Sequence, residues 1–216
     1  MTEAIPEEYP STKLPLGLTI GLVVLAFALA SGVIIYSGFR ELQNGGKQDA
    51  VALADYGAVP EFVLTERSEK SISLADLKGS IWVADFIFTH CAGPCPRMTM
   101  QMAEVQRAIA AAPHVKLVSY SVDPERDTPE VLRSYADGYG ADPERWWFLT
   151  GPVQTISHLA VNGFHVGTLD DPILHSTLFA LVDRRGHIRG YYHSDDPELI
   201  KKITDDIAIL VRDKRV

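Results

Sequence analysis

The chain has 216 residues, only two of them cysteines, and a formal net charge of −8 at pH 7. Its 20 Lys and Arg residues form no basic cluster, and together with the negative net charge this argues against nucleic acid as a partner. A hydrophobic share of 46% is ordinary for a chain that buries a core, so we expect a folded protein.

The first feature along the chain is an apolar segment. Residues 14–39 carry no charged side chain, and at about 1.5 Å per residue a helix of that length exceeds the roughly 30 Å apolar layer of a bilayer. We therefore predict one transmembrane anchor. A cleaved signal peptide is the alternative, because residues 28–30 have cleavage-like spacing, but the tail 1–13 is acidic where signal peptides are basic.

Two further regions follow the predicted anchor. Residues 40–55 are mostly polar and read as a linker. Residues 56–216 have the size of one domain, and no internal repeat divides them. The charges flanking the anchor are too balanced to orient it in the membrane.

Within the domain, strand patterns alternate with helix patterns. The expected strands lie at 62–65, 81–88, 115–120 and 146–149, and the expected helices at 95–111, 127–137 and 153–161. Next comes a hairpin of two strands at 178–182 and 187–192, and a closing helix that starts at Asp196. This order predicts an α/β, thioredoxin-like fold, with a mixed central sheet flanked by helices.

Local patterns refine two of these helices. Asp127, followed by Glu130 three residues later, predicts a capping box that opens the second helix. In the first helix, Met98 and Met102 fall on an apolar stripe, so we expect them in the core rather than on a metal.

Both cysteines lie where the strand 81–88 turns into the first helix. The start of a helix favours negative charge, so at least one of Cys91 and Cys95 should ionise more readily than a free thiol. Four residues apart, they can meet one soft metal ion, Cu(I) or Zn with further ligands, or each other. A purely stabilising disulfide has little rationale because so short a loop closes little chain entropy.

Three other side chains are candidates near the thiols. His175 precedes the hairpin, in a loop that a thioredoxin-like fold returns toward the cysteine helix, although periodicity alone makes it a weak candidate. His90 adjoins Cys91 but should point away from it, because side chains alternate along an extended chain. Asp123 ends a central strand beside the thiols, and a supporting role for it stays open.

Three separated motifs resemble one known family. Residues 88–96, residues 121–128, and His175-Ser176 ahead of residues 181–183 are together similar to the SCO/SenC proteins. The resemblance covers the chain from residue 56 to the closing helix. It implies a membrane-anchored, thioredoxin-fold, copper-binding protein that helps assemble cytochrome c oxidase.

The resemblance also implies a site and a location. Cys91, Cys95 and His175 would be the ligands of copper, as Cu(I) or Cu(II), and the soluble domain would lie in the periplasm or the mitochondrial intermembrane space. Expected partners are the copper-bearing oxidase subunit, a copper donor chaperone and a thiol reductant. Many members carry acidic residues where this chain has Gly93-Pro94 and Leu174, so fewer carboxylates are expected around the metal.

Two functions are expected from these residues. The first is a copper metallochaperone that holds the ion through the three ligands and releases it by ligand exchange. The alternative is a thiol–disulfide oxidoreductase, in which Cys91 attacks and Cys95 resolves the mixed disulfide. A membrane-tethered redox or copper sensor stays open as well. Because the expected compartment is oxidising, each of these roles needs a reductant for the thiols.

Overall fold

The computed structural model describes residues 29, 31–33, 36, 53–167 and 177–213. The chain divides into two units, Met1–Ala50 and Val51–Val216. Most of the predicted anchor, 14–39, lies outside the described residues, although Leu29, Ser31–Val33 and Tyr36 are helical. In the part of the chain that is described, no helix is both long and apolar enough to span a bilayer.

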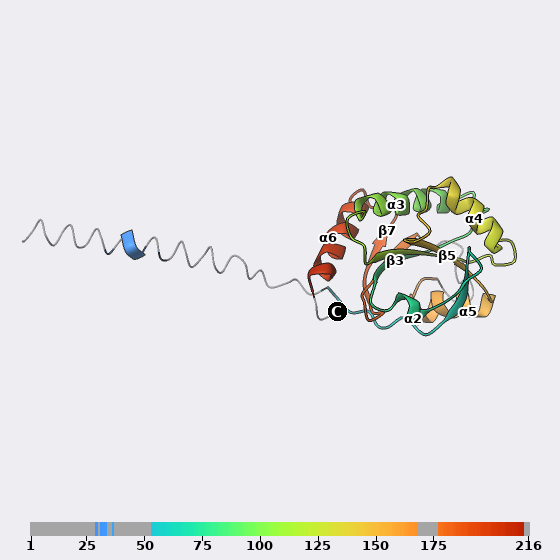
Figure 1. The fold of residues 1–216 in the computed structure, drawn as a ribbon, viewed down its shortest axis with the longest axis horizontal. Coiled ribbons are helices and arrows are strands. Elements are labelled where there is room, and N and C mark those ends of the chain that lie inside the picture. Colours follow the sequence, from blue (N-terminus) through green and yellow to red (C-terminus); the bar gives the residue numbers. More distant parts are fainter. Residues whose placement is uncertain (1–28, 30, 34–35, 37–52, 168–176, 214–216) are drawn as a thin grey trace, which may run out of the picture. The chain divides into compact units, whose positions relative to one another are not determined.

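The second unit is built on one mixed sheet of seven strands in the order β2-β1-β5-β4-β3-β6-β7 (Figure 1). The strands are β1 Val63–Glu66, β2 Ser71–Ser73, β3 Ile81–Ile87, β4 Val115–Ser121, β5 Trp146–Thr150, β6 Leu178–Val182 and β7 Ile188–His193. The three central strands β3, β4 and β5 are parallel, whereas β1 and β6 run antiparallel to their central neighbours. The predicted mixed sheet is confirmed.

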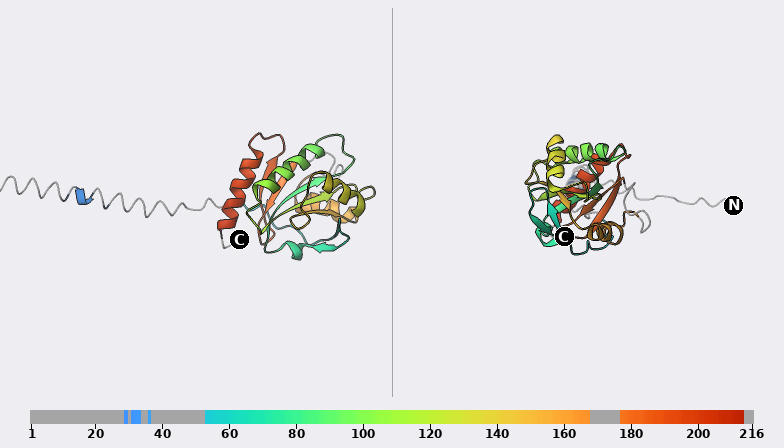
Figure 2. Two further views of the ribbon diagram at one scale, coloured as in Figure 1. Left: turned by 45° about the horizontal axis from the view of Figure 1, so that its top comes forward. Right: turned by 90° about the vertical axis from the view of Figure 1, so that its right-hand side faces the viewer.

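Helices cover both faces of this sheet. The helices are α2 Leu74–Leu77, α3 Cys95–Ala108, α4 Pro129–Gly138, α5 Val153–His158, the π-helical turn η1 Leu159–Gly163, and α6 Leu199–Arg212. The ribbon shows α3 and α4 on one side of the sheet and α2 and α5 on the other (Figures 1 and 2). The buried side chains accordingly form two clusters, one beneath α3, α4 and α6 and one beneath α2, α5 and η1. This is the α/β architecture that the sequence predicts.

Strand β3 is an inner strand of the sheet, between β4 and β6, and every one of its seven residues is buried. Ile81, Val83 and Ile87 belong to the cluster beneath α3, and the alternate residues Trp82 and Phe86 belong to the opposite cluster. Successive side chains of a strand point to opposite faces, so an apolar run of this kind can be covered on both sides. The buried strand therefore fixes the position of the turn that leads to α3.

Three local predictions differ from the structure. No element was expected between the strands 62–65 and 81–88, but the structure contains β2 and α2 there. The second helix begins at Pro129 with Thr128 as its N-cap, so the predicted cap at Asp127 is wrong. The expected helix 153–161 is α-helical only to His158 and continues as a π-helical turn. The other predicted strands and helices are present within a few residues of their expected ends.

A buried ion pair fixes the hairpin of β6 and β7 to the beginning of the domain. Asp183, fully buried, accepts from Arg189 at 3.0 Å. The same guanidinium donates to the carbonyls of Leu53, at 2.6 Å, and Ala54, at 2.8 Å. The first described residues of the second unit are thereby held against β7.

Candidate metal and redox site

The cysteines lie at the carboxyl end of β3, as predicted from the sequence. The chain turns after Phe88, and α3 begins at Cys95 with Pro94 as N-cap and Pro96 in the first turn. Proline fits there because the first N–H groups of a helix have no partner within it. Cys91 is half-buried and Cys95 is buried, and both are free thiols.

The two sulfurs differ in their surroundings. The N–H of Gly93 donates to the Cys91 sulfur at 3.3 Å. Partial burial raises the pKa of Cys91, but hydrogen bonding by the Cys95 side chain and backbone, and by Gly93, outweighs it and leaves that pKa below its ordinary value of 9.0. Burial, followed by the hydrogen bond with Cys91, raises the pKa of Cys95 to about 12. Cys91 is therefore the readily ionised thiol and Cys95 the one that keeps its proton.

This difference predicts an order of chemical modification. With iodoacetamide at pH 8, Cys91 should be alkylated about tenfold or more faster than Cys95, because only the thiolate reacts and Cys95 is also buried. Timed quenching and peptide mass spectrometry of the reduced, metal-free protein measure both rates. In denaturant the two rates should converge. Equal rates in the folded protein would contradict the assignment.

The turn that carries Cys91 is held by a buried carboxylate from another element. Asp127, just before α4, is fully buried. It accepts from the hydroxyl of Thr89 at 2.6 Å and from the N–H of Thr89 at 3.1 Å. It also accepts from the hydroxyl of Ser121, the last residue of β4, at 2.6 Å. We call this set of contacts the Asp127 anchor.

A second buried carboxyl lies on the sheet beneath α3. Asp85 alternates in β3 with Val83 and Ile87, so it faces the same cluster as Cys95, and it is fully buried. Neither carboxyl oxygen has a hydrogen-bond partner among the described residues, although Ser119 is its neighbour on β4. Burial raises the pKa of Asp85 to about 7, and the nearby Ser119 hydroxyl offsets only part of that rise.

The structure also describes the other candidate side chains near the thiols. His90 is exposed and shares a 3.0 Å hydrogen bond with the Thr89 hydroxyl. Asp123 accepts from Arg126 at 3.0 Å in an exposed turn. Met98 and Met102 are fully buried, so their predicted role in the core is confirmed.

The predicted ligand His175 lies outside the described residues. The next described residue is Thr177, whose carbonyl accepts from the N–H of Ser194 at 2.8 Å. The carbonyl of Ser194 in turn accepts from two side chains of α3, Arg97 and Gln101. Thr177 is therefore attached, through one residue, to the helix that begins at Cys95. Within residues 53–167 and 177–213, no three His, Cys, Asp or Glu side chains are grouped to hold a metal ion.

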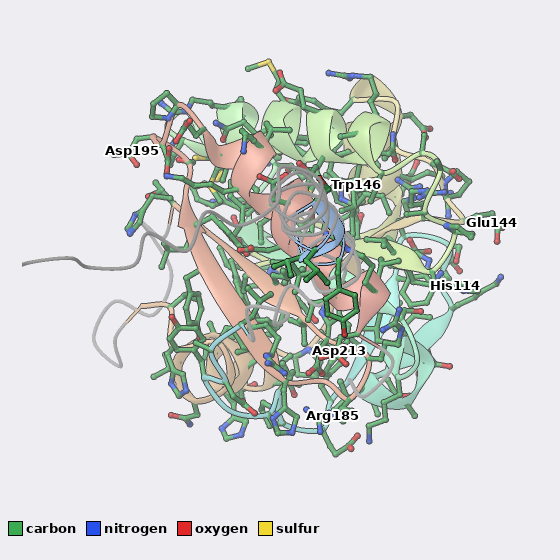
Figure 3. All side chains as sticks on the ribbon, turned by 90° about the vertical axis from the view of Figure 1, so that its left-hand side faces the viewer. His114, Glu144, Trp146, Arg185, Asp195 and Asp213 are labelled. Atoms are coloured by element: carbon green, nitrogen blue, oxygen red, sulfur yellow. The ribbon has the colours of Figure 1, made fainter. Side chains whose placement is uncertain are left out.

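The strand directions place these features at one end of the sheet. Strand β6 runs antiparallel to both β3 and β7, so β6 begins where the other two end. Figure 3 shows Asp195, which follows Ser194, on the opposite side of the domain from His114, which precedes β4. The thiols, Thr177 and the turn after β7 thus share the carboxyl end of β3, where ligand sites form in open sheets of this type.

The comparisons with known proteins agree on one family. The family model described as SCO1/SenC matches residues 52–212. The SCO1 protein homolog of Bacillus subtilis is 32% identical over 197 residues, which cover 88% of this chain and 94% of that protein.

Solved structures of the same family have the same fold. BsSco, a member of the Sco family of cytochrome c oxidase assembly proteins in which a disulfide switch was identified, superposes with a TM-score of 0.66 at 32% identity. That match covers 75% of this chain and 97% of BsSco. ScoI of Bradyrhizobium japonicum, solved with copper bound, gives a TM-score of 0.59 at 27% identity and covers 71% of this chain and 99% of ScoI.

Proposed function

This chain belongs to the SCO1/SenC family, and from that premise we propose that it binds copper through Cys91 and Cys95 and delivers the ion during assembly of cytochrome c oxidase. The observation that carries the proposal is the pair of free thiols in hydrogen-bonding reach at the open end of the sheet. Copper is the cargo in this function, so the protein must release it as well as bind it.

The donor atoms fit this ion. Thiolates are soft ligands that favour Cu(I), and the half-exposed Cys91 ionises readily. Cys95 must lose its proton when the metal binds, so binding should release protons and strengthen as the pH rises. Copper bound in the homologous ScoI structure supports the choice of metal.

We include His175 as the third ligand. Its support is the family resemblance of its motif together with the position of Thr177, two residues further on, beside the cysteine end of α3. An imidazole added to two thiolates gives a site that also holds Cu(II), because nitrogen ligands suit the oxidised ion.

Location and partners complete the proposal. Residues 14–39 would anchor the protein in a membrane, 40–55 would be the linker, and the domain 56–216 would lie outside the cytoplasm, in the periplasm or intermembrane space. The receiving partner would be the copper-bearing subunit of the oxidase. A copper donor chaperone would load the site, and a thiol reductant would keep both cysteines reduced.

Copper loading of the full-length protein in detergent tests the metal site. The wild type should take up about one copper per chain and show a thiolate-to-Cu(II) charge-transfer band, which both Cys91→Ser and Cys95→Ser should abolish. His175→Ala should weaken Cu(II) binding about 10- to 100-fold or more. Replacing a residue that only hydrogen-bonds to a metal ligand already has an effect of that size.

His90→Ala is the matched control for this experiment, since it removes an exposed imidazole next to Cys91. It should leave the copper content and the absorption band unchanged. Copper content that survives removal of both cysteines would refute the proposal.

A second function, thiol–disulfide exchange, is favoured by the inequality of the two thiols. The Cys91 thiolate would attack a partner disulfide and release one partner thiolate, and the Cys95 thiol would lose its proton and attack the Cys91 sulfur. A Cys91–Cys95 disulfide forms, two electrons pass to the partner, and the second partner thiolate leaves. Cys95→Ser should trap the mixed disulfide, and exchange that survives in His175→Ala without copper binding would favour this function.

A further inference from the structure

The Asp127 anchor is an unusual use of a buried charge. Its carboxylate is fully buried and has no ion-pair partner among the residues that the structure describes. Its hydrogen bonds come from neutral donors, the backbone and hydroxyl of Thr89 and the hydroxyl of Ser121. Burying a carboxylate without a cation is costly, so the three donors compensate for lost hydration.

The anchor joins three segments that are distant in sequence. Thr89 follows β3, Ser121 ends β4, and Asp127 leads into α4. Neighbouring bonds make this junction rigid, because the N–H of Val122 donates to the carbonyl of Ile87 at 2.9 Å and the N–H of Asp127 donates to the carbonyl of Asp123 at 2.8 Å. The carboxylate therefore sits in a fixed frame, and it transfers that position to Thr89.

Thr89 is two residues before Cys91, so the anchor acts close to one sulfur. The other sulfur is fixed separately, since Cys95 is the first residue of α3 and its carbonyl accepts from the Thr99 hydroxyl at 2.9 Å. Cys91 instead lies in a turn whose own backbone bond, from its N–H to the Phe88 carbonyl, is long at 3.3 Å. Beyond the bonds within the cysteine turn itself, the described hydrogen bonds that hold the Cys91 side of the pair thus come from Asp127.

We propose that Asp127 is a positioning residue that sets the Cys91 sulfur against the Cys95 sulfur, so that the pair is ordered before it meets its reaction partner. Residues that orient ligands from outside typically change metal affinity 10- to 100-fold when they are replaced. Two groups held in place also react with each other at a high effective concentration. Both consequences can be measured, and only the first rests on the proposed copper function.

The variants separate positioning from simple destabilisation. Asp127→Asn removes the charge with little change of shape. Thr89→Val removes the 2.6 Å hydroxyl bond to Asp127 and the hydroxyl's bond to His90, and it keeps the N–H bond to Asp127. Thr128→Ala is the matched control: it deletes the N-cap of α4, whose hydroxyl accepts from the Val131 N–H, and it leaves Thr89 and Asp127 intact. A purely structural role for Asp127 predicts that its variant and the Thr128 control behave alike.

The first measurement uses Cu(I) in competition with a chromogenic chelator on the full-length protein. Asp127→Asn should weaken Cu(I) binding 10- to 100-fold. Thr89→Val should weaken it less, and the double variant should resemble Asp127→Asn because both changes break the same contact. Thr128→Ala should bind as the wild type does. Wild-type affinity in Asp127→Asn and Thr89→Val would overturn the proposal.

The second measurement is free of metal. The reduced protein is equilibrated with oxidised and reduced glutathione, so that one molecule of oxidised glutathione takes two electrons and yields the Cys91–Cys95 disulfide and two reduced glutathiones. The effective concentration of the thiol pair should fall about tenfold in Asp127→Asn and stay unchanged in Thr128→Ala. Equal values in Asp127→Asn and wild type would overturn the proposal.

The two measurements distinguish the failure of each idea. A wild type that binds no Cu(I) would remove the proposed copper function, while the glutathione equilibrium would still decide the role of Asp127. Circular dichroism of each variant identifies loss of fold, and Thr89→Val, which keeps the buried carboxylate, carries the test if Asp127→Asn does not fold.

Discussion

Asp85→Asn should raise the free energy of unfolding of this protein by about 1–3 kcal/mol at pH 8, although most substitutions at fully buried positions destabilise. The reason is the carboxyl group's burial without a hydrogen-bond partner among the described residues. Its pKa rises from 3.8 to about 7, so ionising it in the folded state costs about 4 kcal/mol more than in water. The asparagine amide does not ionise, so this cost is absent in the variant. Because the buried amide needs hydrogen bonds of its own, the net gain in free energy of unfolding is smaller than about 4 kcal/mol.

The stability gained through Asp85→Asn should depend on pH, and it should increase as the pH rises. The pKa of Asp85 in the folded state lies above its unfolded value of 3.8, so between about pH 4 and 7 the folded protein holds a proton that the unfolded chain has released. The Asp85 contribution to wild-type stability is therefore full below pH 4 and is lost as the pH rises through 7. The difference between Asp85→Asn and wild type should grow across that window.

Urea unfolding of the reduced, metal-free protein at pH 4, 5.5, 7 and 8 measures this difference. Asp206→Asn is the control, since its carboxylate already accepts from the Tyr192 hydroxyl at 2.6 Å, and that substitution should not stabilise the protein. A stability difference between Asp85→Asn and wild type that is the same at every pH would show that ionisation of Asp85 is not its source.

A loss of stability is expected when the ion pair between Asp183 and Arg189 is broken. Arg189→Met should lower the free energy of unfolding by about 3–5 kcal/mol, because it leaves the fully buried Asp183 carboxylate without its close charge partner. For a domain of this size that corresponds to a melting temperature lower by about 6–20 °C. The carbonyls of Leu53 and Ala54 lose their donor in the same variant.

Arg185→Met is the matched control for the ion pair. Its guanidinium also approaches Asp183, at 3.6 Å, but its side chain is 53% exposed. An exposed partner of this kind contributes little, so the substitution should cost less than about 1 kcal/mol. Thermal unfolding followed by circular dichroism compares the two variants, and similar losses in both would contradict the ranking.

Much of the fold could be predicted because its main elements carry strong local patterns. The run from Ile81 to Ile87 is buried on both faces, and the cysteine turn follows it directly, so the strand, the turn and α3 were predictable together. In contrast, β2 and α2 have only three and four residues, too few for a periodic pattern to develop. Their positions are set by pairing with β1 and by burial of Leu74 and Leu77.

The contacts that support the site were harder to predict. Asp127 matches the sequence pattern of a helix cap, yet Thr128 takes that role, and the Asp127 carboxylate bonds to Thr89, 38 residues earlier. Local sequence contains no information about a partner so distant. Asp85 could have been found from the sequence, since it is a charged residue in an apolar run that predicts a buried strand. Charged residues are rarely fully buried without a partner, so such a position is informative.

The attachment of residues 53–59 to the hairpin of β6 and β7 lies at one end of the sheet. The carbonyls of Leu53 and Ala54 accept from Arg189 near the start of β7. The N–H of Tyr56 donates to the carbonyl of residue 188, and the N–H of Val59 donates to that of residue 186. Because β7 ends where β3 ends, this attachment lies at the pole of the sheet away from Cys91 and Cys95. A force applied through the chain before residue 53 would therefore reach the sheet at the pole opposite Cys91 and Cys95.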